Sequence, residues 1–225
     1  MELIQNECQY CGRQYRTVKG FDAHSCKLKL RYESANKKEV KIGFQGFVSF
    51  YKRSINKDKT YTDFVKSPYY QAFISWGRYV TEIRAIAPEA FLNYLLDNNK
   101  KIDQWCRDNI YETFLLEHLL KESVADALTR SIETSLQWAQ RTNMQSHDIL
   151  RYGNPNGTVY YITTGRISPW ALYNCVSGQY FLNNLNVEQL SIVLPYIDPD
   201  KWNAILMNNS VDKLYAEEIL EKAGW

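Results

Sequence analysis

Apolar side chains recur at spacings of three and four through the last three quarters of the chain, which is the period of helices packed on one face. The clearest run spans residues 102–122. Its apolar residues on one approximate face are Ile102, Trp105, Ile110, Phe114, Leu115 and Leu119. The wider gap after Trp105 allows a break near Asp108-Asn109. The pattern predicts a helical body over residues 61–225.

Helix start signals divide this body. Serine, asparagine and aspartate cap helix N-termini, and proline is favoured in the first turn. We expect helices to begin at Ser67-Pro68, Pro88-Glu89, Ser123 (running through Gln140), Ser168-Pro169, Asn186 with Gln189, Asp198-Pro199 and Ser210 with Asp212. The last of these helices is expected to end at Gly224.

One segment has a different pattern. Residues 154–166, NPNGTVYYITTGR, place turn residues ahead of β-branched and aromatic residues. That order predicts a short β-hairpin or a single strand on the helical body. Its exposed face would carry Tyr160, Thr164 and Arg166.

A further helical stripe precedes the body. Val40, Phe44, Phe47 and Tyr51 follow one another at spacings of 4, 3 and 4, and basic residues flank them. Two interpretations stay open: the stripe packs on the main domain, or its rings and the basic residues hold a strand of nucleic acid. Packing is the first expectation, because aromatic stripes at helical spacing more often lie in a core.

Charge is divided unevenly along the 225 residues. The net charge is +2, but residues 1–60 hold 13 Lys and Arg against 6 Asp and Glu, whereas the remaining 165 residues hold 14 against 19. A basic arm on a mildly acidic body favours a polyanionic partner, most often nucleic acid. The chain is also rich in aromatics, with 17 Tyr and 6 Trp. The expected core anchors are Trp76, Trp105, Trp170 and Trp202.

Nothing in the pattern indicates a membrane partner. No run approaches the roughly 18 apolar residues of a transmembrane helix. The first ten residues, MELIQNECQY, lack the basic start and apolar stretch of a signal peptide. The cysteines, three clustered at zinc-type spacing and two scattered, are more typical of a protein in a reducing compartment than of one held together by disulfide bonds. We therefore expect a cytoplasmic location.

The densest chemistry lies in residues 8–26, CQYCGRQYRTVKGFDAHSC. Cys8 and Cys11 form a C-x2-C pair, which places two sulfurs on one tight turn at the spacing that tetrahedral zinc needs. His24 follows Cys11 after 12 residues, and Cys26 lies two positions beyond His24. These four residues predict a Zn²⁺ site. The alternative is a chance grouping of reduced cysteines.

The stretch resembles a C2H2-type zinc finger in a CCHC form, with Tyr15 and Phe21 at the family's apolar positions. The resemblance implies a ββα unit too short to bury a core, so that metal supplies its folding energy. The fourth ligand departs from the family pattern, because only Ser25 separates His24 from Cys26. Two positions on a continuous helix are about 200° apart, so the helix must end near His24 for Cys26 to bind.

This finger is poorly equipped to recognise bases. The family pattern puts Thr17, Gly20 and Ala23 at the base-contacting positions, and two of these have almost no side chain. Basic residues can still contact phosphates, which position a protein without specifying a sequence. The predicted nucleic-acid-binding residues are Arg13, Arg16, Lys19, Lys27, Lys29 and Arg31.

No catalytic motif accompanies the finger. Besides His24, the chain has only His118, in an amphipathic run, and His147, in a stretch beside Asp148. A His-Asp pair can orient an imidazole for base catalysis, but it is also a common loop pairing. The familiar nucleotide-binding, hydrolase, zinc-protease and deaminase motifs are absent, so the sequence assigns no catalytic residue.

Four blocks outside the finger resemble a group of tailed-phage proteins. They are KSPYYQAF, NKKIDQWCRDNIYE, GRISPWALYNC and YIDPDKW. The resemblance implies a phage protein made in the cytoplasm of a bacterial host, and it implies no particular activity.

These observations predict a mainly α protein with three parts: a small N-terminal zinc-stabilised ββα finger at residues 1–30, a basic linker and helix at 31–60, and a helical domain with one short β-hairpin at 61–225. We expect a nucleic-acid-associated protein that binds DNA in particular, with weak sequence specificity, and acts with a phage or host protein partner. Two alternatives stay open. One is a nucleic-acid-processing enzyme with a site near residues 147–166, at His147, Arg151 and Arg166. The other is an adaptor whose finger binds a protein.

Overall fold

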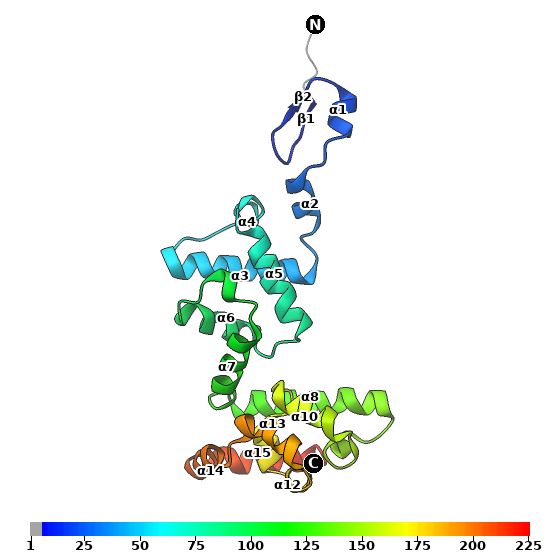
Figure 1. Cartoon of the computed structure of the whole chain (residues 1–225), viewed down its shortest axis with the longest axis vertical. Coiled ribbons are helices and arrows are strands. Elements are labelled where there is room, and N and C mark those ends of the chain that lie inside the picture. The colour runs from blue at the N-terminus through cyan, green and yellow to red at the C-terminus, as the bar shows by residue number, and fades with distance from the viewer. Residues whose placement is uncertain (1–5) are drawn as a thin grey trace. The chain divides into compact units, whose positions relative to one another are not determined.

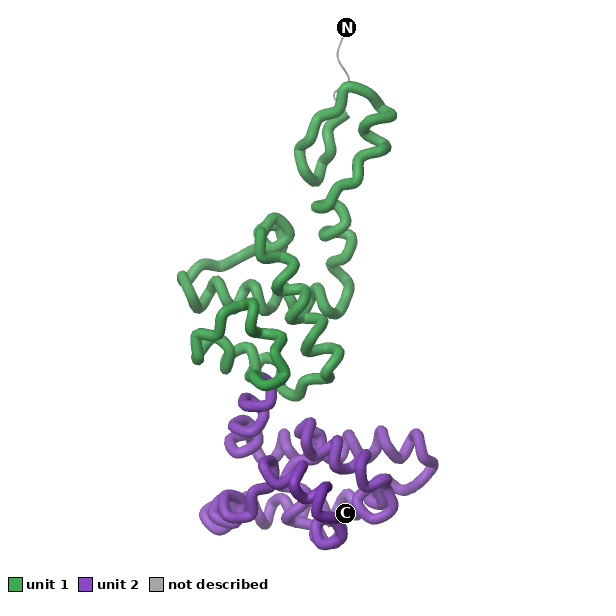
Figure 2. The backbone as a smooth tube through the Cα atoms, viewed as in Figure 1, with its two compact units in different colours: residues 1–110 green, residues 111–225 purple. Residues whose placement is uncertain are grey.

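The protein is mainly helical, with two short strands at its N-terminal end, as the sequence predicts. A computed structural model describes residues 6–225, and Figure 1 shows the order of the elements. The chain divides into two compact units, residues 1–110 and 111–225 (Figure 2). Among the described helices, none has the length and apolar character that crossing a bilayer requires.

The first unit begins with a small hairpin. Strands β1 (Asn6–Glu7) and β2 (Gln14–Tyr15) pair antiparallel, with Asn6 opposite Tyr15. The helical elements that follow are α1 (Val18–Asp22), α2 (Lys27–Glu33), α3 (Lys38–Ile55), α4 (Tyr61–Lys66), α5 (Tyr70–Glu82), α6 (Pro88–Asp97) and the 3₁₀ turn η1 (Ile102–Gln104). Helix α7 (Asp108–Leu119) starts at the end of this unit and continues into the second.

Helices joined by turns and loops make up the second unit, and no strand occurs in residues 111–225. Its elements after α7 are α8 (Val124–Thr142), the 3₁₀ turn η2 (Ser146–Asp148), α9 (Ile149–Tyr152), α10 (Pro155–Thr163), α11 (Pro169–Tyr173), α12 (Val176–Asn183), α13 (Val187–Ile197), α14 (Pro199–Asn208) and α15 (Ser210–Lys222). Trp170 and Trp202 anchor the core as predicted, since both are buried and their rings meet edge to face at 5.8 Å.

Most helix start signals act as predicted. Side chains accept hydrogen bonds from first-turn N–H groups at Ser123, Ser168, Asn186 and Asp198. The start predicted at Ser67-Pro68 is displaced: Ser67 is the C-cap of α4, its hydroxyl accepts a hydrogen bond from the Tyr69 N–H at 3.1 Å, and α5 begins only at Tyr70. A capping box between Thr60 and Asp63 starts α4, a separate short helix that was not predicted.

The hairpin predicted at residues 154–166 is wrong. Most of these residues form α10, whose start has the Asn154 side chain as its cap and Pro155 in the first turn. Val159 and Ile162 are buried three positions apart, which is helical spacing. The β propensity of this stretch is thus outweighed by a local start signal and by packing of one helical face.

The aromatic stripe of α3 packs inside the first unit. Val40 and Phe47 are each 2% exposed, and the rings of Phe47 and Phe73 meet edge to face at 5.4 Å. The predicted anchors Trp76 and Trp105 lie in the same cluster, with rings 5.8 Å apart. The packing interpretation of the stripe is therefore confirmed.

Two glycines let α3 and α5 approach each other closely. A Cβ atom at Gly43 would lie 2.7 Å from the backbone oxygen of Phe73, and one at Gly77 would overlap the backbone oxygen of Glu39. Both neighbours are backbone atoms of the facing helix, so no side-chain rotation can make room. The contact between these helices therefore depends on the absence of a side chain at both positions.

We expect Gly77→Ala to destabilise the first unit. Overpacking of this kind costs about 1–3 kcal/mol, and the higher helix propensity of alanine offsets about 1 kcal/mol of that cost. Urea unfolding followed by tryptophan fluorescence measures the change. The matched control is Gly157→Ala, where the new methyl group would meet only the Cβ of Asn154, at 3.8 Å. Equal unfolding midpoints for the two variants would contradict the close approach.

Candidate metal centre

Three cysteines and one histidine converge in residues 6–26, which we call the finger. The ligand atoms of Cys8, Cys11, His24 and Cys26 all lie within 4.8 Å of one another. Cys11 Sγ is 3.3 Å from His24 Nε2. A tetrahedral zinc with bonds of about 2.3 Å to sulfur and about 2.0 Å to nitrogen holds neighbouring ligand atoms about 3.5–3.8 Å apart. The four predicted ligands are thus brought together at a spacing that fits one metal ion.

The hairpin places the first two sulfurs. The backbone N–H of Cys8 donates to the carbonyl oxygen of Arg13 at 2.9 Å, and the N–H of Gly12 donates to that of Cys8 at 2.7 Å. Gly12 has a φ of +69°, a left-handed conformation that glycine adopts at low cost. This tight turn brings Cys11 back beside Cys8.

Backbone N–H groups point at the sulfurs. Those of Cys11 and Tyr10 hydrogen bond to Cys8 and lower the pKa of its thiol to about 6. Lys29 N–H donates to Cys26 Sγ at 3.4 Å. Such bonds stabilise a thiolate, which is the form that binds metal. The local backbone therefore favours negative charge on these sulfurs.

Each cysteine sulfur also disfavours negative charge on the others. The backbone N–H of Arg13 lowers the pKa of the Cys11 thiol. Desolvation and the sulfurs of Cys8 and Cys26 raise it, and the overall change is an increase. Close thiolates repel because each disfavours a second negative charge. A cation at the centre of the cluster would remove this repulsion.

Helix α1 ends before the last two ligands, as their spacing requires. Its C-cap is Ala23, and Cys26 is the N-cap of α2, with an extended backbone at φ −95° and ψ 107°. His24 and Cys26 therefore lie in the connection between two helices. Because no continuous helix carries both, the separation of about 200° does not arise, and both can face one point.

The finger has almost no core besides its ligands. The rings of Tyr15 and Phe21 lie 6.0 Å apart, and that of Tyr15 lies 4.9 Å from the His24 imidazole. Within residues 6–26 the buried side chains are Cys8 and Cys26, each 5% exposed. The interior of this segment is the ligand cluster itself.

Five of the six predicted nucleic-acid-binding residues are exposed. They are Arg13, Arg16, Lys19, Lys27 and Lys29. Lys29 lies 3.8 Å from Glu33 in an exposed ion pair, which contributes little and opens readily. These cations are available to a partner.

Arg31 has a different place. It is half-buried, donates a hydrogen bond to the backbone oxygen of Val65 at 2.6 Å, and lies 4.3 Å over the ring of Tyr70. Its guanidinium therefore joins α2 to the chain around α4 and α5. The sequence alone does not distinguish this arginine from the exposed ones.

The residues considered for a catalytic site are not all brought together. His147 and Arg151 line one cavity of about 210 Å³, and His147 Nε2 lies 3.8 Å from a carboxylate oxygen of Asp148. Arg166 does not line this cavity; its guanidinium lies 5.4 Å over the Tyr160 ring. The three residues therefore do not form one site.

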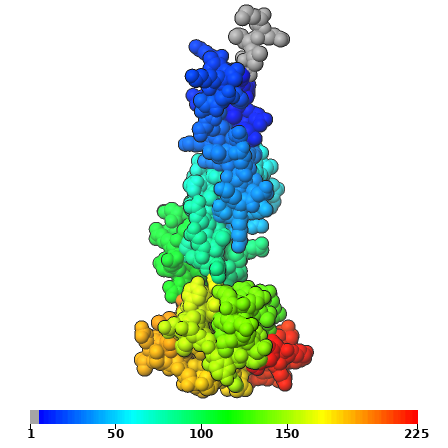
Figure 3. Space-filling view, turned by 90° about the vertical axis from the view of Figure 1, so that its right-hand side faces the viewer, coloured from blue at the N-terminus to red at the C-terminus, as the bar shows by residue number. Residues whose placement is uncertain are grey.

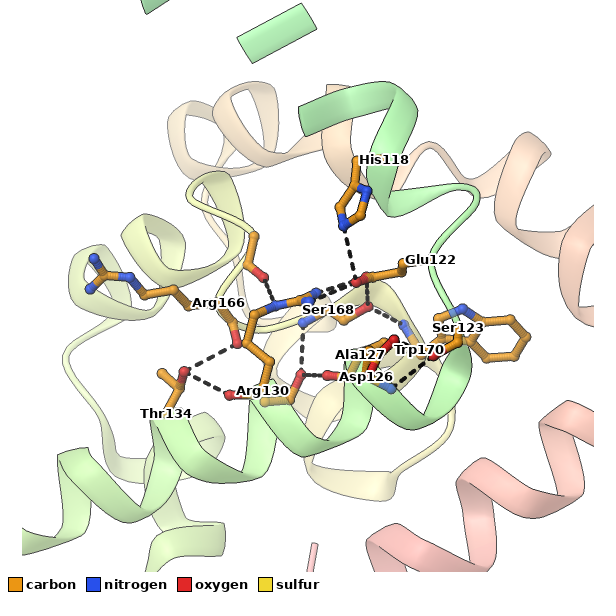
Figure 4. Close-up of polar contacts among 12 residues, drawn as sticks. His118, Glu122, Ser123, Asp126, Ala127, Arg130, Thr134, Arg166, Ser168 and Trp170 are labelled. Carbon is orange, nitrogen blue, oxygen red and sulfur yellow. Dashed lines mark hydrogen bonds and ion pairs between the residues drawn. The ribbon is translucent and has the colours of Figure 1, made fainter. Parts of the chain in front are cut away.

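A buried ion pair in the second unit was not predicted. Arg130 donates from Nη2 to Glu122 Oε1 at 2.7 Å, and its Nη1 is 2.7 Å from Oε2. Figure 4 shows that Ser168 Oγ also donates to this carboxylate and that Arg130 Nε donates to the backbone oxygen of Gly165. The pair thus joins the start of α8 to the chain that leads into α11.

One other titratable group faces this carboxylate. His118 Nε2 lies 4.0 Å from Glu122 Oε2, and burial lowers the pKa of this imidazole despite the nearby carboxylate. Burial thus favours the neutral form of His118, and Arg130 is the cation that pairs with Glu122. Because Ser168 is buried, the network is structural and presents no nucleophile to solvent.

The donor set of the finger is that of a closed structural site. Three sulfurs and one imidazole fill four tetrahedral positions, which leaves none for water or substrate. Magnesium and calcium sites are built from oxygen ligands instead. No protein-family model, curated protein or solved structure matches this chain.

Proposed function

We propose that the finger is a structural zinc module that presents a phosphate-binding surface to DNA. The observation that carries this proposal is the convergence of Cys8, Cys11, His24 and Cys26 within 4.8 Å. Zn²⁺ prefers thiolate and imidazole ligands at this spacing. Metal binding would fix the finger and, with it, the basic residues on its surface.

The distribution of charge supports a nucleic-acid partner. The first unit holds 19 Lys and Arg against 12 Asp and Glu, whereas the second holds 8 against 13. The exposed cations Arg13, Arg16 and Lys19 lie on the finger itself. Lys and Arg side chains bind the phosphate backbone by charge, and this contact supplies most non-specific affinity.

Weak sequence specificity follows from the start of α1. Thr17 Oγ1 accepts a hydrogen bond from the Gly20 N–H at 3.1 Å, so this hydroxyl is used to cap the helix. Gly20 and Ala23 carry no group that can bond to a base edge. The finger would therefore hold DNA without selecting a sequence, and selectivity would come from a protein partner.

We expect the triple variant Arg13→Ala, Arg16→Ala, Lys19→Ala to bind DNA about 10- to 100-fold more weakly. The loss should be similar for unrelated duplexes, because phosphates are common to all of them. The slope of log affinity against log salt should fall by about 1 for each phosphate contact removed. Fluorescence anisotropy on two unrelated duplexes between about 50 and 200 mM salt measures both quantities.

The matched control removes the same charge from the second unit. Lys121→Ala, Arg141→Ala, Lys213→Ala replaces three exposed cations there and should leave DNA affinity nearly unchanged. Zinc content of both variants should equal that of the unaltered protein. Equal losses in the two triple variants would assign binding to net charge rather than to the finger.

A further inference from the structure

The C-terminal helices expose a group of apolar side chains. We call it the α14–α15 apolar face; its members and their exposed fractions are Met207 (83%), Val211 (78%), Leu214 (66%) and Tyr215 (43%). The three on α15 are spaced by three and four positions, so they share one side of the helix. Single exposed apolar residues are ordinary, but a group of this kind marks an interaction site.

Helix α15 packs on its own unit through other apolar residues. Ala216 and Leu220 are 0% and 1% exposed and belong to the core of the second unit. Figure 3 shows the C-terminal residues, in red, at the surface of the molecule. Val211, Leu214 and Tyr215 are therefore apolar residues of α15 beyond those that the core of the second unit buries.

Carboxylates outnumber cations in the stretch of chain that carries this face. Residues 186–225 hold seven Asp and Glu against three Lys. Each lysine already pairs with a carboxylate close to it in sequence; the pairs are Lys201–Asp198, Lys213–Glu217 and Lys222–Glu218. The exposed carboxylates left over are Glu188, Asp200, Asp212 and Glu221. The region therefore carries uncompensated negative charge.

We propose that the α14–α15 apolar face binds a basic amphipathic helix of a partner protein. A row of apolar side chains at spacings of three and four fits the apolar side of a second helix laid along it. The surplus carboxylates would attract Lys and Arg beside that apolar side and set the orientation of the bound helix. The same charge disfavours nucleic acid, and it disfavours the equivalent acidic face of a second copy.

This site lies wholly in the second unit, so it goes beyond the DNA contact proposed for the first. The probe is a labelled peptide of about 18 residues, or five helical turns. Its Leu residues are spaced by three and four positions so that they share one side of the helix, and Lys occupies the other positions. A peptide with Glu in place of each Lys is its counterpart. We expect the full-length protein to bind the Leu/Lys peptide at micromolar concentration and the Leu/Glu peptide at least about ten-fold more weakly, since only the first has complementary charge.

Two variants separate apolar contact from charge. Leu214→Asp should weaken binding of the Leu/Lys peptide by at least about ten-fold, because it places a charge in the contact. The double variant Asp212→Asn, Glu221→Gln should weaken it less and should flatten its dependence on salt. Leu214 is largely exposed, so the variant folds; far-ultraviolet circular dichroism checks this.

The matched control is Leu136→Asp, which makes the same change at a 48% exposed leucine of α8. It should leave peptide binding unchanged. Equal binding of the two peptides, or binding that survives Leu214→Asp, would overturn the proposal. A dimer in sedimentation equilibrium that Leu214→Asp converts to monomer would assign the face to a second copy instead, which also overturns it.

Discussion

Cys8→Ser is expected to abolish zinc binding and to unfold the finger while the helices from α3 onward keep their structure. The buried side chains of the finger are two of its ligands, so no apolar core remains once the metal is lost. Zinc binding by finger-sized units supplies about 10–16 kcal/mol, which is also their folding free energy. The core of the first unit, around Phe47 and Trp105, lies outside the finger.

Three measurements check this result. Metal analysis should give one zinc per chain for the unaltered protein and none for Cys8→Ser. Limited proteolysis should cut the variant within residues 6–26, and circular dichroism should show almost unchanged helix content. A chelator should reproduce the same state in the unaltered protein. An ordered, protease-resistant finger in metal-free protein under reducing conditions would contradict the prediction.

Two further cysteine variants test which cysteines bind the metal. Cys106→Ser changes an exposed cysteine outside the cluster and should keep the zinc. Cys26→Ser separates two roles of one residue, because serine is also a good helix N-cap. It should therefore preserve α2 while metal affinity falls. If Cys26→Ser retains zinc as tightly as Cys106→Ser, then Cys26 is not the fourth ligand.

The ligand cluster could be predicted from the sequence because its determinants are short-range. A C-x2-C pair fixes two sulfurs on one turn, whatever the rest of the chain does. The end of α1 before His24 followed from helix geometry once Cys26 was taken as a ligand. The helix caps at Ser123 and Asn186 could also be predicted from the sequence. Each cap side chain accepts a hydrogen bond from a backbone N–H in the first turn of its own helix.

Other features depend on contacts between distant residues. Residues 154–166 were expected to form a strand because the local start signal at Asn154-Pro155 was read as a turn, and because the pattern of β-branched residues does not reveal the burial of Val159 and Ile162. The division into two units falls within α7, so no linker composition marks it. Arg31 was grouped with the exposed cations because its contact with Val65 joins residues 34 positions apart.

Arg130→Met is expected to lower the free energy of unfolding of the second unit by about 3–5 kcal/mol, the usual cost of removing one partner from a buried ion pair. The side chain of Glu122 is 2% exposed, so water cannot replace the lost cation. The hydrogen bond from Arg130 to the backbone of Gly165 is lost as well. Urea unfolding of the full chain, followed by circular dichroism and tryptophan fluorescence, measures the change.

Two comparisons test whether burial of the ion pair causes this loss of stability. Glu122→Gln combined with Arg130→Met removes both charges, and it should cost less than Arg130→Met alone because no uncompensated carboxylate stays buried. Lys213→Met breaks an ion pair with Glu217 in which both side chains are nearly half exposed, and it should cost less than about 1 kcal/mol. If Arg130→Met cost no more than Lys213→Met, the pair would not be what holds the chain before α11 against α8. The hydrogen bond from the Ser168 backbone to Ser131 would then be the contact that holds it.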